Sequence, residues 1–428
     1  MLSPAHDFAA GVTAPPLADR PPLRTGRLVA AVVALGLGGF AIGTTEFVTM
    51  GLLPDLAEGV GITIPTAGHL ISAYALGVVV GAPVIAALAT RLPRRAVLLG
   101  LMAAFIVGNV LTAVAPGYGS LLASRFLAGL PHGAYFGVAS LVAASLVAPH
   151  LRGRAVSSVM LGLALANVAG VPSATWLGQQ FGWRTAYWAV AVLALLTIAA
   201  TAWVVPSAPG NREATVRTEL GALRRPQVLL TLLVGVVGFG GMFAVYSYIA
   251  PLVTEVTGMS RAAIPLVLLA FGAGGVLGTA VGGRLADLAL FPSLVGANVV
   301  TGVLLALVPA AARTPVTLVL AIFLLAATAS VLVVCLQLRL MEVAGEAQML
   351  GAALNHSALN AANALGAWLG GLVIAAGLGY TAPGWVGAGL AVLGLLALTA
   401  SAVLRRRELR AVAAGGLVAP HPEPAVAR

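Results

Sequence analysis

A single carboxylate lies deep inside a long apolar stretch of this 428-residue chain: Glu46, in the run Gly43-Thr-Thr-Glu-Phe47. The stretch covers about residues 28–53, which at ~1.5 Å per residue is enough to cross a ~30 Å hydrocarbon core. A charged carboxylate there is costly, so we expect Glu46 to be protonated, paired with a cation or open to a wet cavity. Each state makes it a candidate proton carrier. The alternative is a neutral Glu46 that hydrogen-bonds a neighbouring helix.

Arg125 and His132 are the other candidates for proton chemistry, and both lie in the apolar stretch 120–146. Counted from the outer ends of their stretches, Arg125 and Glu46 reach the same depth within one helical turn. We therefore expect an ion pair between them, because an isolated Arg in the membrane is as costly as an isolated Glu. The alternative for Arg125 is a structural anchor to backbone carbonyls. His132 suits a proton path because imidazole titrates near neutral pH.

Composition determines the class of protein that positions these residues. Hydrophobic residues make up 60% of the chain and charged residues 8%, which excludes a water-soluble domain of this length. The single cysteine, Cys335, excludes a disulfide within one chain. We predict an all-α polytopic membrane protein with twelve transmembrane helices, at about residues 28–53, 67–89, 96–115, 120–146, 155–177, 186–205, 227–253, 263–286, 294–309, 315–337, 348–376 and 382–404.

The arginines predict the orientation. Of the 23 basic residues, 19 flank the spans on one side and three, Arg184, Arg261 and Arg313, flank them on the other, with Arg125 inside a span. The positive-inside rule places both termini in the cytoplasm. The net charge of +10 therefore indicates membrane-flanking clusters rather than a nucleic-acid-binding face.

An internal repeat divides the chain into two bundles of six spans. An offset of 197 residues aligns Pro54 with Pro251 and also aligns two pairs of glycines, Gly77 with Gly274 and Gly81 with Gly278. The same offset aligns Glu46 with Phe243, so the carboxylate belongs to one half. We expect a disordered cytoplasmic tail over 1–27, bundles at 28–205 and 227–404, a cytoplasmic linker at 206–226 and a second tail at 405–428.

Five motifs carry a family resemblance: Gly43-Thr-Thr-Glu-Phe47 with Met50 to Pro54, Tyr74 to Gly77 with Gly81-Ala-Pro83, Leu121 to Arg125 with His132-Gly133, Gly170-Val-Pro172 with Gly178, and Gly182-Trp183-Arg184. The chain resembles the major facilitator superfamily over all twelve spans. It is most similar to drug:proton antiporters of the branch that contains chloramphenicol-resistance and arabinose or purine exporters. The resemblance implies a proton-coupling role for Arg125 and a substrate site between the halves.

The loop between spans two and three resembles the superfamily's cytoplasmic signature, which holds the halves together when the transporter faces outward. Its basic part is kept in Arg91, Arg94 and Arg95, whereas the second copy keeps the acidic position as Asp287. We predict that Asp287 pairs with Arg154 or Arg152 in a cytoplasmic gate. The alternative for Arg94 and Arg95 is a role in topology alone.

The fifth span carries a loosened form of the family's antiporter motif, which favours an exporter over an importer. Its glycines at eight-residue spacing lie on nearly one face of a helix and permit close backbone contact, while the proline bends the helix. The residues concerned are Gly162, Gly170, Pro172 and Gly178.

Polar and aromatic residues of the spans are candidates for the substrate cavity, and the alternative for each is hydrogen bonding or packing between helices. We predict a cavity lined by Thr45, Asn109, Asn167, Tyr246, Tyr248, Asn355 and His356.

No phosphate-binding loop or metal-ligand spacing occurs in the sequence, so we expect neither an enzyme nor a cofactor, and no metal site. The leading prediction is a monomeric secondary exporter that exchanges protons for a small hydrophobic drug of the chloramphenicol type by alternating access across the lipid bilayer. Export of a sugar or nucleoside metabolite is the alternative. A channel or a transporter-like sensor is the alternative of a different class.

Overall fold

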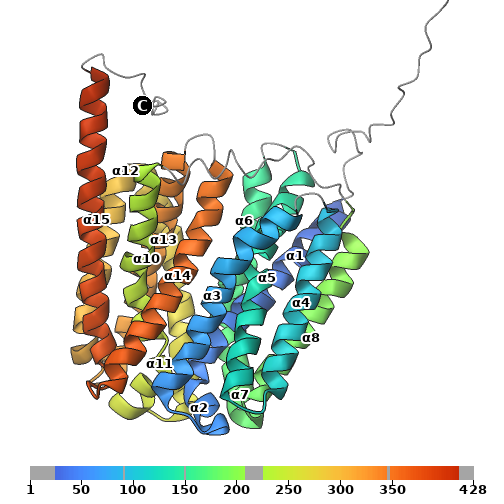
Figure 1. Cartoon of the computed structure of the whole chain (residues 1–428), viewed down its shortest axis with the longest axis vertical. Helices are drawn as coiled ribbons and strands as arrows, with labels where there is room; N and C mark the ends of the chain where they lie inside the picture. The colour runs from blue at the N-terminus through green and yellow to red at the C-terminus, as the bar shows by residue number, and fades with distance from the viewer. Residues whose placement is uncertain (1–24, 90–91, 149–150, 208–224, 345–347, 414–428) are drawn as a thin grey trace, which may run out of the picture.

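The computed structural model describes residues 25–89, 92–148, 151–207, 225–344 and 348–413, and every regular element within them is helical. Figure 1 shows the helices side by side, those of the amino-terminal half in blue to green and those of the carboxy-terminal half in yellow to red. Most of the two predicted tails and of the predicted linker, together with Arg91, lies outside the described residues.

The amino-terminal half holds six membrane-crossing segments. Its fifth crossing is composite, with a π-helical turn between two α-helices, and a short helix, α2 (Leu53–Val60), follows the first crossing. The crossings are α1 (Thr25–Gly51), α3 (Ile64–Ala89), α4 (Arg94–Val114), α5 (Tyr118–Ser145), α6 (Arg152–Leu165) with η3 (Ala166–Gly170) and α7 (Val171–Phe181), and α8 (Arg184–Val204).

The carboxy-terminal half repeats this order. Short helical segments follow its first crossing: α11 (Ile249–Pro251), η5 (Leu252–Val256) and η6 (Arg261–Ala263). The crossings are made by α10 (Pro226–Tyr246), α12 (Ile264–Ala311), α13 (Pro315–Ala344), α14 (Gln348–Ala375) and α15 (Ala382–Ala413).

The number of crossings agrees with the prediction. By length and composition, 11 helical segments of the described chain are able to span a membrane, and one of them, Arg261–Ala311, has 51 residues. At ~1.5 Å per residue that segment is more than twice as long as a ~30 Å core. Its backbone leaves the helical conformation at Ala289 (φ −163°, ψ 85°), which divides it into the predicted eighth and ninth spans. The chain therefore crosses twelve times, as expected of the fold class.

Two helices extend beyond the boundaries predicted for their spans. α1 begins at Thr25, inside the tail predicted to be disordered up to residue 27. α15 continues to Ala413, nine residues past the predicted end of the last span at residue 404. The last span was predicted to end where the arginines lower the hydropathy. The α-helix itself continues, because its backbone hydrogen bonds form whether or not the side chains are apolar.

The predicted repeat is confirmed by the way the helices cross. In each half, glycines of the second crossing meet backbone carbonyls of the fourth so closely that an added Cβ would lie 2.0–2.2 Å from the oxygen. The contacts are Gly77 with Phe126, Gly81 with Leu130, Gly274 with Phe323 and Gly278 with Ala327. Both members of each contact are shifted by the same 197 residues between the halves. Glycine is required here because the backbones touch.

Large apolar side chains cover the outside of the helical bundle. Trp203 is 85% exposed, Phe181 67% and Leu266 66%. Such a surface would drive association in water, whereas in a bilayer it faces acyl chains. The protein is a multi-pass membrane protein.

Candidate transport site

The site is built around Thr45, which is fully buried and joins three helices. Its hydroxyl donates to Asn109 Oδ1 of α4 at 2.5 Å and accepts from Arg125 Nη1 of α5 at 3.4 Å. Its carbonyl oxygen accepts from Arg125 Nη2 at 3.1 Å. Asn109 is itself held by a bond from Nδ2 to the Phe105 carbonyl. The structure thus brings together three residues that the sequence nominated separately.

Arg125 is 1% exposed and lies between aromatic rings. Its guanidinium carbon is 4.4 Å from the ring centroid of Tyr74 on α3 and 5.4 Å from that of Tyr187 on α8. Contacts of this kind stabilise a desolvated cation by about 0.5–2 kcal/mol each. Arg125 Nε has no hydrogen-bond partner among the described residues.

The expected ion pair between Glu46 and Arg125 is not formed. Of the described charged groups, four pairs come within 4.0 Å, and none of them includes Glu46 or Arg125. The geometric reason is that Thr45 and Glu46 are neighbours in a helix, so their side chains point about 100° apart, and the guanidinium binds the Thr45 side. Arg125 thus adopts the alternative of a carbonyl anchor, yet it still interacts electrostatically with Glu46.

Glu46 faces groups from both halves of the molecule. Its side chain is buried, and besides Arg125 it interacts electrostatically with Tyr74 of α3 and Tyr246 of α10 and lies beside the Asn363 amide of α14. Neither polar atom of Asn363 is in hydrogen-bond geometry with any described group. The carboxyl therefore sits at the contact between the halves, where a relative motion of the halves changes its surroundings.

His132 and His356 come together across the two halves. The Tyr74 hydroxyl and His132 Nδ1 are 3.1 Å apart, which joins the Arg125 environment to the imidazole. Phe136 lies between the two histidines, with its centroid 5.3 Å from His132 and 5.7 Å from His356, onto which it stacks at 4°. A continuous series of side-chain contacts thus runs from Arg125 through Tyr74 to His356.

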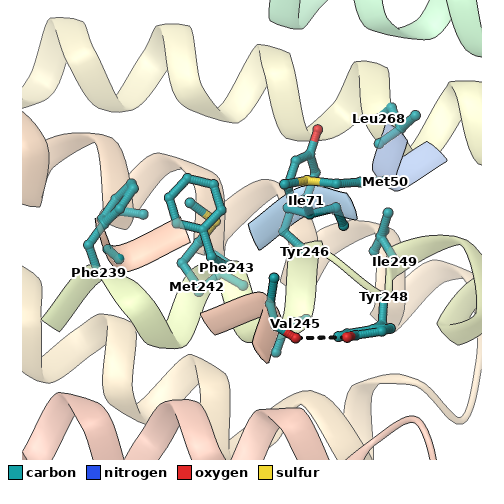
Figure 2. Packing of buried hydrophobic residues seen from close by; sticks show 14 of the residues in the cluster. Met50, Ile71, Phe239, Met242, Phe243, Val245, Tyr246, Tyr248, Ile249 and Leu268 are labelled. Carbon is teal, nitrogen blue, oxygen red and sulfur yellow. Dashed lines mark hydrogen bonds between the residues drawn. The ribbon is translucent and has the colours of Figure 1, made fainter. Parts of the chain in front are cut away.

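An aromatic cluster adjoins the carboxyl. Phe47 is 6.3 Å from Phe243 and 6.0 Å from Tyr246 between ring centroids, and Tyr246 stacks on Phe271 at 3.9 Å. Figure 2 shows Phe239, Met242 and Phe243 along α10, and the same apolar cluster includes Met50 and Ile71 of the amino-terminal half. The residue that replaces Glu46 in the repeat, Phe243, belongs to this cluster.

Three of the residues predicted to line the cavity make contacts within the protein. Asn355 donates to Gln337 Oε1 of the neighbouring α13 at 3.4 Å. The Tyr248 hydroxyl donates to the Ala367 carbonyl at 2.7 Å. Asn167 lies in the π-helical turn η3, donates to Leu163 within its own span, and its backbone carbonyl meets Gly272 of the other half. The role of these residues in a substrate cavity stays a prediction.

The glycines of the predicted antiporter motif pack on α1, the helix that carries Glu46. A Cβ added to Gly162, Gly170 or Gly178 would lie 2.0, 2.2 and 2.5 Å from atoms of Gly36, Thr44 and Leu52, respectively. Both series advance by eight residues, so the fifth span follows the first in register. Between Gly162 and Pro172 the helix widens into η3, and such π-helical turns are frequent at functional sites.

Residues 35–296, more than half of the chain, match the family described as Major Facilitator Superfamily. The chain belongs to the major facilitator superfamily. This confirms the resemblance found in the motifs, and it makes the chain a transporter rather than an enzyme.

This transporter has relatives that match along nearly their whole length. It is 43% identical over 371 residues to the protein named inner membrane transport protein YdhP of Escherichia coli strain K12, covering 87% of this chain and 95% of that one. It is 36% identical to the chloramphenicol resistance protein of Streptomyces lividans, covering 83% and 92%. The crystal structure of D-xylose-proton symporter has a TM-score of 0.69 and 18% identity, with 86% and 97% covered, and it shows the shared fold.

The two halves of the transporter are joined by apolar side chains at the end that carries α2 and η6. One apolar cluster joins Leu56 and Leu70 to Ile249 and Leu268 across the halves, whereas a second cluster, including Leu98 and Val142, contains only residues of the amino-terminal half. At the same end, Arg261 of η6 lies 3.5 Å from Asp55 and 3.7 Å from Glu58. The arginine distribution predicts that this is the outer end, so we call these three residues the outer clasp. The two halves are in contact with each other at this end.

The predicted cytoplasmic gate is not formed in this state. Asp287, Arg152 and Arg154 are exposed, and the described part of the chain contains no ion pair between them. Arg95 donates to the Ala202 carbonyl within its own half, and Arg94 is partly buried. A clasp that holds the cytoplasmic ends together belongs to the outward-facing state, so a pairing of Asp287 remains a prediction.

Several residues of the site were not nominated by the sequence. Tyr74 was quoted as part of a motif, but its contacts with Arg125 and His132 depend on how α3 and α5 face each other. Phe136 and Tyr187 carry no polar signal in an apolar span. The outer clasp joins Asp55 to Arg261, which are 206 positions apart. The one signal for it in the sequence is that both residues follow the first span of their half.

Proposed function

We propose that this transporter is a proton-coupled exporter of a small, neutral, hydrophobic drug, that it works by alternating access, and that Glu46 carries the proton. The observation on which the proposal rests is the position of Glu46. It is a buried carboxyl on α1 that faces groups of both halves, and the glycines of the fifth span pack closely against α1.

The cycle follows from this position. In the outward-facing state, Glu46 takes a proton from the outer solution. When the outer side closes and the cytoplasmic side opens, the proton leaves to the cytoplasm as substrate enters, and Arg125, anchored on Thr45, favours the charged carboxylate left behind. Return of the loaded transporter releases the drug outside. The proton gradient is the energy source, and no cofactor enters the cycle.

A lipophilic substrate is supported by the aromatic cluster beside Glu46 and by the relative named a chloramphenicol resistance protein. Aromatic side chains bind a flat apolar ring by stacking, while the Asn363 amide, which has no hydrogen-bond partner among the described residues, offers a polar contact. The arginine distribution places both termini in the cytoplasm of a bacterial inner membrane. The transporter acts as a monomer, since one chain holds the complete site.

Transport by Glu46→Gln in proteoliposomes tests the proposal. Chloramphenicol movement driven by an imposed pH gradient, and the counterflow of protons, should fall at least about tenfold, because an amide does not titrate at physiological pH. Glu255→Gln is the matched control, since Glu255 is an exposed carboxylate on the outer side. Proton-coupled export at the wild-type rate in Glu46→Gln would overturn the role of Glu46. Coupled export of labelled sugars or nucleosides, with no chloramphenicol transport by the wild type, would favour the metabolite alternative.

A further inference from the structure

The cytoplasmic end of α15 carries arginines that no described acidic group neutralises. The run Arg405-Arg-Arg-Glu-Leu-Arg410 holds four arginines against one glutamate. Arg405 is 3.9 Å from Glu342, whereas Arg406, Arg407 and Arg410 are exposed and take part in none of the ion pairs of the described residues. Two other arginines of this half have partners, since Arg339 binds Glu342 at 2.8 Å and Arg225 bonds the Val343 carbonyl.

Arg406 closes one end of an apolar groove between α12 and α15. The groove is lined by Phe291 and Val295 of α12 and by Leu395, Leu398, Thr399, Ala402, Val403 and Arg406 of α15. The Thr399 hydroxyl bonds the Leu395 carbonyl within its own helix, so it adds no free polar group to the groove. A second depression on the adjacent face of α15 again includes Thr399 and Val403 and ends at Arg407.

The height of these arginines matches the headgroup region of a bilayer. α15 begins at Ala382 on the outer side, and Arg406 follows 24 residues later, or ~36 Å along the axis. That exceeds the ~30 Å hydrocarbon core, so the guanidinium groups lie at the level of lipid phosphates while the groove lies within the acyl region. In Figure 1, α15 lies at one edge of the bundle and projects beyond the ends of the other helices. Thr399 and Val403 on this face are exposed.

We propose that this surface binds an anionic phospholipid of the cytoplasmic leaflet, with its phosphate between Arg406 and Arg407 and an acyl chain in the groove beside Phe291. The chemistry is complementary at both ends. Guanidinium groups bind phosphate oxygens through paired N–H donors, and unpaired cations attract anionic lipid headgroups. An apolar groove that continues from the phosphate site distinguishes a lipid from a soluble anion. The site is separate from Glu46 and does not depend on the transport substrate.

Native mass spectrometry of the full-length transporter tests the site directly. The detergent-purified protein is titrated with phosphatidylglycerol and, separately, with phosphatidylethanolamine of the same acyl chains. The wild type should retain phosphatidylglycerol in preference to phosphatidylethanolamine. The double variant Arg406→Gln with Arg407→Gln should bind phosphatidylglycerol about 25-fold more weakly, at about fivefold for each arginine. Arg313→Gln, an exposed arginine on the outer side, should leave binding unchanged.

The groove and the headgroup site are tested apart. Thr399→Phe fills both depressions without changing the charge, so it should weaken phosphatidylglycerol binding while leaving the preference for an anionic headgroup intact. Inorganic phosphate at millimolar concentration should not displace the lipid. Wild-type affinity in the double arginine variant would overturn the proposal, as would equal retention of the two lipids. Full displacement by phosphate, or no effect of Thr399→Phe, would overturn the acyl-chain part. Thermal unfolding of each variant shows that it is folded.

Discussion

The outer clasp allows the balance between the two states of the transporter to be predicted. Arg261→Gln removes both ion pairs that join Arg261 to Asp55 and Glu58, while the Gln179 bond to the Arg261 backbone carbonyl is retained. We expect the outer side to open more often. The substitution acts on an exposed loop, so the fold of either half should not change.

The free energy that the two ion pairs contribute depends on how exposed their side chains are. Exposed ion pairs contribute about 0.2–1 kcal/mol. The pair with Asp55, whose side chain is 19% exposed, belongs near the upper end of that range, and the pair with Glu58, at 76% exposed, belongs near the lower end. Together they stabilise the closed state by about 1 kcal/mol. Their loss should shift the equilibrium between closed and open outer sides about fivefold toward the open state.

Spin labels across the outer opening measure this shift. Gly119, where an added side chain meets open space, and Val316, which is 77% exposed, report on opposite halves. Replacement of the one native cysteine, Cys335, leaves no competing thiol. The ratio of the long-distance to the short-distance population should rise about fivefold in Arg261→Gln and stay unchanged in Arg313→Gln. An unchanged distribution in Arg261→Gln, or an equal shift in Arg313→Gln, would refute the reasoning.

Two further predictions concern the pH dependence of the clasp and the crossing of helices. Burial raises the pKa of Asp55 above its ordinary value, and Arg261 only partly offsets this, so the closed state binds a proton more readily than an open state with a solvated Asp55. The closed population should grow as the pH falls through the raised pKa of Asp55, and it should level off below ~3.9, the ordinary pKa of an aspartate. In Asp55→Asn, this change of the spin-label distances with pH should disappear. Gly129→Ala places a Cβ 2.1 Å from the Tyr74 carbonyl oxygen, so it should lower stability by about 1–3 kcal/mol in thermal unfolding. Gly137→Ala, on the same helix with open space around it, should be neutral, and equal melting of the two variants would contradict the close contact.

The sequence alone determined the class, the twelve crossings, the repeat and the unusual carboxylate. Each of these can be counted along the chain without knowing how the helices pack: the length of an apolar stretch, the positions of arginines and the constant offset of 197 residues between matching glycines. Glu46 could be singled out because a carboxylate in an apolar span is costly wherever the span packs. Arg125 was nominated by the same cost, whereas Thr45 and Asn109 were nominated as polar residues of the spans.

Tertiary structure decided which groups meet. Arg125 was expected to pair with Glu46 at its depth, but it binds Thr45, one residue away and about 100° around the helix. Asn355 turned toward Gln337, while Asn363, eight residues along the same helix, lies beside Glu46. Depth in the membrane follows from counting residues, whereas direction depends on the rotation of each helix, which is set by close contacts such as those of Gly162 with Gly36. The closed outer side likewise depends on pairing between residues more than 200 positions apart, which no local pattern specifies.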